Sequence, residues 1–160
     1  MGRGAHEIDV VTVARAELRS DRMVEGVRLV EHTADVGIEA EGESMAECLA
    51  RVAAGLFGLM FLPAADADPD RELEVDLEAG SDEELLVAWL HELLYRTEVE
   101  DICFIHFEVE GVGHRLKGGA RGIPLAETEP AGPGIKAVTR HDLQLARVDG
   151  RWRARVLVDV

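Results

Sequence analysis

Three carboxyl groups stand at places where this sequence could bind a metal ion. Asp159 is followed only by Val160, so its side chain and the free chain terminus offer adjacent oxygen ligands. Asp35 lies in EHTADVG, residues 31–37, at the edge of a predicted strand. Hard oxygens that converge from two places suit Ca²⁺ or Mg²⁺, whereas zinc prefers more nitrogen or sulfur ligands. Spacing alone leaves open the alternative that these are ordinary solvated aspartates.

Other chemistries have little support. The stretch GVGHRLKGGARG lacks the third glycine of a dinucleotide-binding loop, because Leu116 stands at that place, and no phosphate-loop lysine motif follows. Its glycines are more typical of a kinked strand. No GxSxG occurs, and Cys48 and Cys103 lack metal spacing, which favours reduced, buried thiols. Among the six histidines, His32 is the one that a turn could bring together with Thr33 and Asp35.

The elements that would position these groups follow from periodicity and helix caps. Alternating residues predict strands over 27–31 and 36–42. Capping boxes at Ser44 and Ser81 predict the starts of two helices with apolar stripes. Further strands are predicted around LEVDLEA and ICFIHFEVEG and in the glycine-rich ribbon. We therefore expect an α+β fold, a two-layer sandwich of two helices packed on a mixed, mainly antiparallel sheet.

The last two strands form a predicted hairpin around Asp149-Gly150, a pair typical of a type I′ turn. If Val148 pairs with Arg151, a regular register places His141 opposite Val158 on an apolar face. The same register places Asp159 opposite Arg140 on the wetter face, with Lys136 nearby.

Length and charge limit the possible functions. The chain has 160 residues, a net charge of −15 and no apolar run long enough to span a bilayer, which predicts a cytoplasmic protein without a membrane partner. Such a charge disfavours direct, tight nucleic-acid binding. Residues 1–22 read either as an extension that is not native, with Met23 as the natural start, or as an N-terminal arm with a short helix around VVTVARAEL. Residues 23–160 are expected to form one domain.

Four segments, taken together and in order, resemble the archease family: EHTADVGIEAEG, LLVAWLHELLY, IKAVTRHDL and the terminal VLVDV. The resemblance runs from about residue 25 to 160 and departs from the family pattern at Arg140, where an aromatic residue is usual. It implies a non-catalytic protein cofactor of the RtcB-type RNA ligase in tRNA splicing and RNA repair. Such a cofactor promotes guanylylation of the ligase and multiple turnover.

The resemblance also implies a divalent-metal site, described as calcium-binding, whose ligands by motif match are Asp35, Asp159 and Val160. Mg²⁺ or Mn²⁺ would be alternatives to Ca²⁺. His32 and His141 are candidates to orient the aspartates, and Lys136 could contact a phosphate or a ligase carboxylate. Two rival functions stay open, a metal-dependent phosphoesterase using Asp35, Asp159 and His32, and a chaperone-like acidic interaction module.

Overall fold

The computed structural model describes residues 11–14, 26–32, 35–64, 66–132 and 134–160, with 11–14, 29–32 and 112 described by their backbone alone. Its helices are α1 (Met45–Met60), α2 (Asp82–Glu100) and the short 3-10 helix η2 (Leu125–Glu127). Its strands are β1 (Val11–Ala14), β2 (Val27–His32), β3 (Asp35–Gly42), β4 (Phe61–Pro63), β5 (Arg71–Glu78), β6 (Ile102–Val112), β7 (Arg115–Pro124), β8 (Thr128–Pro130), β9 (Ala137–Val148) and β10 (Arg151–Asp159).

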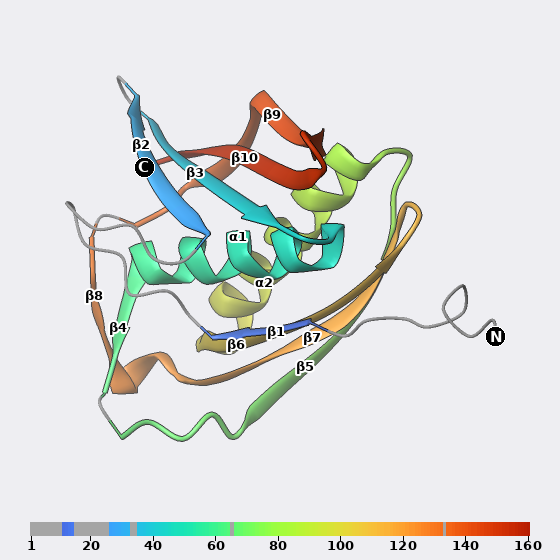
Figure 1. The fold of residues 1–160 in the computed structure, drawn as a ribbon. Coiled ribbons are helices and arrows are strands. Elements are labelled where there is room, and N and C mark those ends of the chain that lie inside the picture. Colours follow the sequence, from blue (N-terminus) through green and yellow to red (C-terminus); the bar gives the residue numbers. More distant parts are fainter. Residues whose placement is uncertain (1–10, 15–25, 33–34, 65, 133) are drawn as a thin grey trace, which may run out of the picture.

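The strands divide into two four-stranded sheets with the helices between them (Figure 1). One sheet has the order β1-β6-β7-β5 and the other the order β2-β3-β10-β9, while β4 and β8 form a separate ribbon. Every pairing described is antiparallel. The predicted α+β class, with two helices packed on mainly antiparallel strands, is confirmed. The expected single sheet in two layers is corrected to two sheets in a three-layer arrangement.

The helices begin where their caps predict. The Ser44 hydroxyl accepts a hydrogen bond from the Glu47 amide, and the Ser81 hydroxyl accepts one from the Glu84 amide, each at 3.1 Å. In α1, 13 of the 16 residues are buried, because this helix contacts β6 of one sheet and β3 and β10 of the other. A helix that is apolar nearly all round must be covered on both sides.

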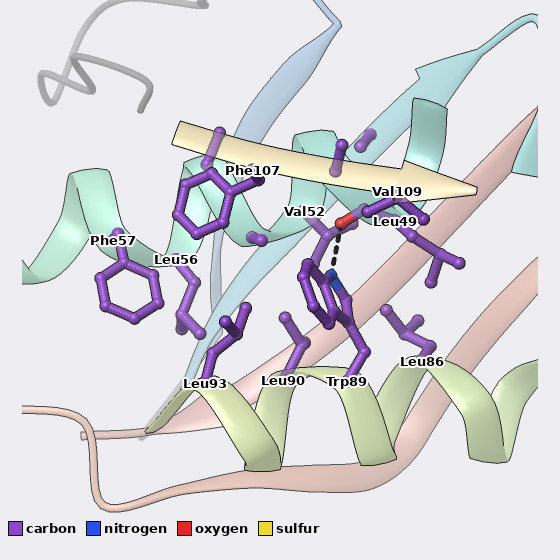
Figure 2. Close-up of a cluster of buried hydrophobic side chains, with 14 of the residues drawn as sticks. Leu49, Val52, Leu56, Phe57, Leu86, Trp89, Leu90, Leu93, Phe107 and Val109 are labelled. Carbon is purple, nitrogen blue, oxygen red and sulfur yellow. Dashed lines mark hydrogen bonds between the residues drawn. The ribbon is translucent and has the colours of Figure 1, made fainter. Parts of the chain in front are cut away.

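The core lies between these layers, and its two helices are joined directly (Figure 2). The buried Trp89 indole on α2 donates a hydrogen bond of 2.9 Å to the Leu49 carbonyl on α1, which satisfies its only polar atom. Both cysteines are buried and neither forms a disulfide, as expected, and burial raises the pKa of Cys48 to about 12. None of the described helices is long and apolar enough to cross a membrane.

The hairpin of β9 and β10 confirms the predicted turn and corrects the predicted register. Asp149 and Gly150 both have positive φ, 53° and 83°, as a type I′ turn requires. Pairing matches the prediction from Val148–Arg151 to Gln144–Arg155 and then shifts at a bulge. The bulge holds Asp142 at a φ of 54° and adds residues to β9.

Beyond the bulge, Asp159 pairs with Ala137, so the predicted pairing with Arg140 is wrong. The predicted place of His141 on the apolar face is also wrong, because its side chain is 71% exposed on the bulge. A bulge of this kind leaves no period-2 pattern in the sequence, so simple alternation could not locate it.

The glycine-rich ribbon is strand β7, and its glycines fit against neighbouring backbone. A Cβ atom on Gly118 would lie 2.2 Å from the Glu108 carbonyl oxygen, and one on Gly122 would lie 2.3 Å from the Cys103 carbonyl oxygen. These close approaches account for glycine at both positions without a phosphate ligand.

Residues 11–14 form strand β1, paired with β6, so the short helix considered for this segment is not what forms there. The remaining residues of the predicted 1–22 extension, 1–10 and 15–22, lie outside the described part of the chain. Whether residues 1–22 are native stays a prediction, as does the boundary at Met23.

Candidate functional site

A single row of residues crosses the whole β2-β3-β10-β9 sheet at the end of the chain. Backbone pairing sets His32 opposite Asp35, Asp35 opposite Asp159, and Asp159 opposite Ala137. The early aspartate and the near-terminal aspartate, 124 positions apart in the numbering, are therefore direct cross-strand neighbours. Directly opposed residues have Cβ atoms about 4.5–5.5 Å apart on the same face of a sheet.

Asp35 and Asp159 face away from the core and are each half-buried. Alternation along β10 explains this, because Val156 and Val158 belong to the core cluster and Asp159 follows on the other face. Neither aspartate makes a side-chain hydrogen bond or an ion pair within the described residues. Like charges directly opposite each other destabilise a sheet, so this row is unfavourable unless a cation lies between the carboxylates.

The end of the chain is held in place at this row. The Lys136 amide donates a hydrogen bond of 2.8 Å to the carbonyl oxygen of Asp159. The side chain of Val160 is half-buried and packs against the core cluster. Chain ends fray unless such contacts fix them, and here the last two residues each have one.

These groups fit a hard divalent cation. Two aspartate side chains and one terminal carboxylate supply up to six oxygen atoms, and Ca²⁺ takes six to eight oxygen ligands in flexible geometry. Within the described ranges no three His, Cys, Asp or Glu side chains are grouped as a metal site. The row described here has only two such side chains, Asp35 and Asp159, and its third carboxylate is that of the chain terminus.

The other predicted site residues are distributed unevenly around this row. His32 takes its place in the row by backbone pairing, while its side chain and residues 33–34 lie outside the described part. Lys136 lies beside Asp159 through its amide, and its side chain is exposed and makes no ion pair with the described residues. His141 is not brought into the row, because it sits on the bulge with its Nε2 3.7 Å from an oxygen of Asp142.

Farther along the same face, opposite charges face each other. Glu39 of β3 lies between Arg28 of β2 and Arg155 of β10 and forms an ion pair with each. Burial opposes ionisation of Glu39, but the hydrogen bonds and charges of the two arginines outweigh it and lower its pKa. One row on, Arg153 of β10 lies opposite Glu41 of β3, with 3.7 Å between their charged atoms.

This part of the face is hollowed into an open groove of about 850 Å³ whose charged lining residues are Arg28, Glu39, Glu41, Glu43, Glu47, Arg51, Arg151, Arg153 and Arg155. The sequence analysis did not identify these residues. For the six of them on or next to β3 and β10, the signal is the alternation of acids in EAEGE against the alternation of arginines in RWRAR, which becomes visible once the two strands are aligned.

Arg140 bridges the bulge to α2. Its guanidinium donates two hydrogen bonds to the Glu84 carboxylate, at 2.9 and 3.0 Å. These bonds lower the pKa of Glu84. Arg140 therefore joins β9 to the first turn of α2, outside the aspartate row.

Comparison of the sequence with known proteins finds one matching family. The model of the Archease protein family matches residues 28–160. The protein archease of Methanopyrus kandleri is 36% identical over 137 residues, covering 82% of this chain and 96% of that protein. The protein archease of Methanosarcina mazei is 35% identical over 139 residues, covering 82% of this chain and 93% of that protein.

Two solved structures have a similar fold. The solution structure of a Methanobacterium thermoautotrophicum protein matches with a TM-score of 0.74 and 30% identity, covering 86% of this chain and all of that one. A Thermotoga maritima archease, described as a possible chaperone, matches with a TM-score of 0.59 at 22% identity, covering 82% of this chain and 94% of that one, which supports the fold alone. The chain belongs to the archease family.

Proposed function

We propose that Asp35, Asp159 and the terminal carboxylate of Val160 hold a divalent cation, Ca²⁺ in preference to Mg²⁺ or Mn²⁺. The observation that carries this proposal is the direct opposition of two half-buried aspartates without a basic partner among the described residues. Farther along the same face, by contrast, Glu39 and Glu41 each lie opposite an arginine. The exception falls where the chain also ends, which adds a third carboxylate.

Family membership supports a role for this site in a partner's reaction. We propose that the chain is a non-catalytic protein cofactor of an RtcB-type RNA ligase, and that it promotes guanylylation and multiple turnover of the ligase in tRNA splicing and RNA repair. A bound cation would supply positive charge at an open, half-buried edge, where a phosphate or carboxylate of the ligase complex could complete its coordination.

The remaining predicted residues have supporting roles in this proposal. Lys136 presents an exposed ammonium group beside the row and is suited to a phosphate or a ligase carboxylate as a point charge. His141 is exposed on the bulge and is suited to a contact with the partner. His32 has the backbone position from which a side chain could orient Asp35.

The decisive experiment is an RNA ligation assay with ligase, GTP and substrate RNA under multiple-turnover conditions. Asp35→Asn and Asp159→Asn should each reduce the number of turnovers by at least about tenfold, while the first turnover of pre-guanylylated ligase is unchanged. Asp149→Asn is the matched control, because it removes one carboxylate from the hairpin turn at a position that asparagine tolerates. Full multiple turnover with both site variants would contradict the proposal.

A chaperone-like function is the second candidate, since the strongly acidic chain, with a net charge of −15, also suits a general interaction module. It predicts that the chain suppresses aggregation of heat-treated client proteins, and that the Asp35→Asn and Asp159→Asn variants do so equally well. Suppression by all variants, together with no effect on ligase turnover, would favour this candidate.

A further inference from the structure

The edge of the β1-β6-β7-β5 sheet is covered by a strand that precedes the family match. Strand β1 pairs with β6 from Val11 opposite Val109 to Ala14 opposite His106. The family model begins only at residue 28. Two relatives are covered over 93–96% of their own length by the matching part. Residues 28–160 therefore correspond to a nearly complete protein in the family, and β1 lies outside the matched part.

Strand β6 is fixed by the core whether or not β1 is present. Phe107 and Val109 are fully buried, and the Phe107 ring lies 5.5 Å from that of Phe57 on α1. On its other side β6 pairs with β7 over nearly its whole length, from Ile102 to Val112. Without β1, this rigid strand would present a row of unpaired backbone N–H and C=O groups, which is a template for another strand.

Strand β1 covers only part of that template. It pairs with four of the 11 residues of β6. Each backbone hydrogen bond contributes a net stabilisation of about 0.5–1.5 kcal/mol, so pairing over four residues contributes little, and a longer segment could pair more tightly. Strand β1 also contacts α1, which adds to its hold on the edge. Short edge strands of this kind belong to the part of a structure that opens most readily.

We propose that the outer edge of β6 is a strand-acceptor site, which β1 fills in the isolated chain and which takes an extended segment of a protein partner in its place. The register defines the chemistry of that segment. Val11 and Val13 occupy the positions opposite the buried Val109 and Phe107, and Thr12 lies opposite Glu108. The occupant is therefore an extended peptide in which β-branched apolar residues alternate with polar or small ones.

This inference does not depend on the cation site, because it concerns the other sheet. The test uses a synthetic peptide of residues 8–16, IDVVTVARA, as the probe, and amide hydrogen exchange as the measurement. The receptors are the full chain, the full chain with Val13→Pro, and a chain that begins at Met23. The last corresponds closely to the length of the family relatives.

The Val13→Pro variant should show exchange at least about tenfold faster at the β6 amides between His106 and Val109 that face β1, with β5 and β7 unchanged. The proline ring fixes φ at about −65°, away from the φ of an antiparallel strand, and so disfavours the pairing. Added peptide should restore protection in this variant and in the shortened chain. It should bind the unmodified full chain at least about tenfold more weakly, because β1 already fills the edge. The same peptide with Val13→Pro should not bind.

Equal binding of the peptide to the unmodified chain and to the two receptors with an open edge would overturn the proposal. So would unchanged exchange at His106–Val109 in the Val13→Pro variant. If the shortened chain does not fold, the Val13→Pro chain alone decides the outcome, because the rest of its sequence is intact. Calcium titration of the Val13→Pro chain, unchanged from the unmodified chain, would separate this site from the cation site.

Discussion

On the outer face of the β2-β3-β10-β9 sheet, charged residues pair differently at the two ends of the strands. At the end near the β9–β10 turn, Glu39 and Glu41 of β3 lie opposite Arg155 and Arg153 of β10. At the other end, the same two strands set Asp35 against Asp159. The register between β3 and β10 is continuous from one end to the other, so within this strand pair the difference lies in residue type.

The two ends illustrate how charge in a sheet can serve stability or binding. Opposite charges across a strand pair stabilise the pairing by roughly 0.2–1 kcal/mol, and like charges destabilise it. The arginine–glutamate rows therefore help to hold the register. The aspartate row costs stability on its own, and under our proposal a bound cation would restore it.

Reversing one charge in the stabilising end should have the largest effect. Arg155→Glu sets two glutamates opposite each other and leaves Glu39, only 17% exposed, with one arginine. We expect the free energy of unfolding to fall by about 2–3 kcal/mol, measured by urea denaturation at pH 7. Arg153→Glu is the matched control and should lower it by less than about 1 kcal/mol, because its ion pair with Glu41 is exposed. Equal effects of both variants would contradict the comparison.

Neutralising Glu39 should have the next largest effect. Glu39→Gln keeps the side-chain shape but leaves Arg28 and Arg155 without the carboxylate that lies between them. We expect a loss of about 1–2 kcal/mol in the free energy of unfolding at pH 7. If the variant is as stable as the unmodified chain, the ion pairs at this end do not stabilise the sheet.

The effect of Glu39→Gln should also depend on pH. The pKa of Glu39 in the folded chain lies below its ordinary value of 4.5. A lowered carboxyl pKa stabilises the fold above the unfolded value, and this contribution is lost as the pH falls through the folded value. The stability difference between Glu39→Gln and the unmodified chain should therefore be constant above about pH 6 and shrink below about pH 4.5. Urea denaturation at several pH values measures it, and a difference that grows in acid would have the wrong sign.

Substitutions in the aspartate row should have the smallest effect on stability, with the opposite sign. In the presence of a chelator, Asp35→Asn or Asp159→Asn should raise the free energy of unfolding by a few tenths of a kcal/mol, because each removes a like-charge repulsion. Thermal unfolding in EDTA is the measurement. A loss above about 1 kcal/mol would show that these aspartates support the fold in a way that the row does not explain.

Much of the fold could be predicted from local signals in the sequence. Ser44 and Ser81 cap the two helices as expected, and Asp149-Gly150 forms the expected turn. The number of layers was predicted wrongly. The sequence of α1 nevertheless indicated it, because a helix with apolar residues on nearly every side must be covered on both sides. The bulge around Asp142 could not be predicted, since a short insertion changes the register without changing the alternation that flanks it.

The candidate site was predictable in part for the same reason. Family-like segments pointed to Asp35 and Asp159, and the pairing of β3 with β10 brings the two together. His141 was misplaced because its predicted position depended on a regular register through the bulge. The ion-paired residues Arg28, Glu39 and Arg155 were missed because they come from three strands whose alignment a single sequence does not reveal.

The central claim is that the end of the chain and an early aspartate bind one divalent cation together, and calcium titration calorimetry tests it most directly. The unmodified chain should bind one Ca²⁺ ion. The affinity should fall by at least about tenfold in Asp35→Asn, in Asp159→Asn and in a chain lengthened by one glycine after Val160, while Asp149→Asn binds normally. Equal affinity in all five chains, or no calcium binding by the unmodified chain, would contradict the claim.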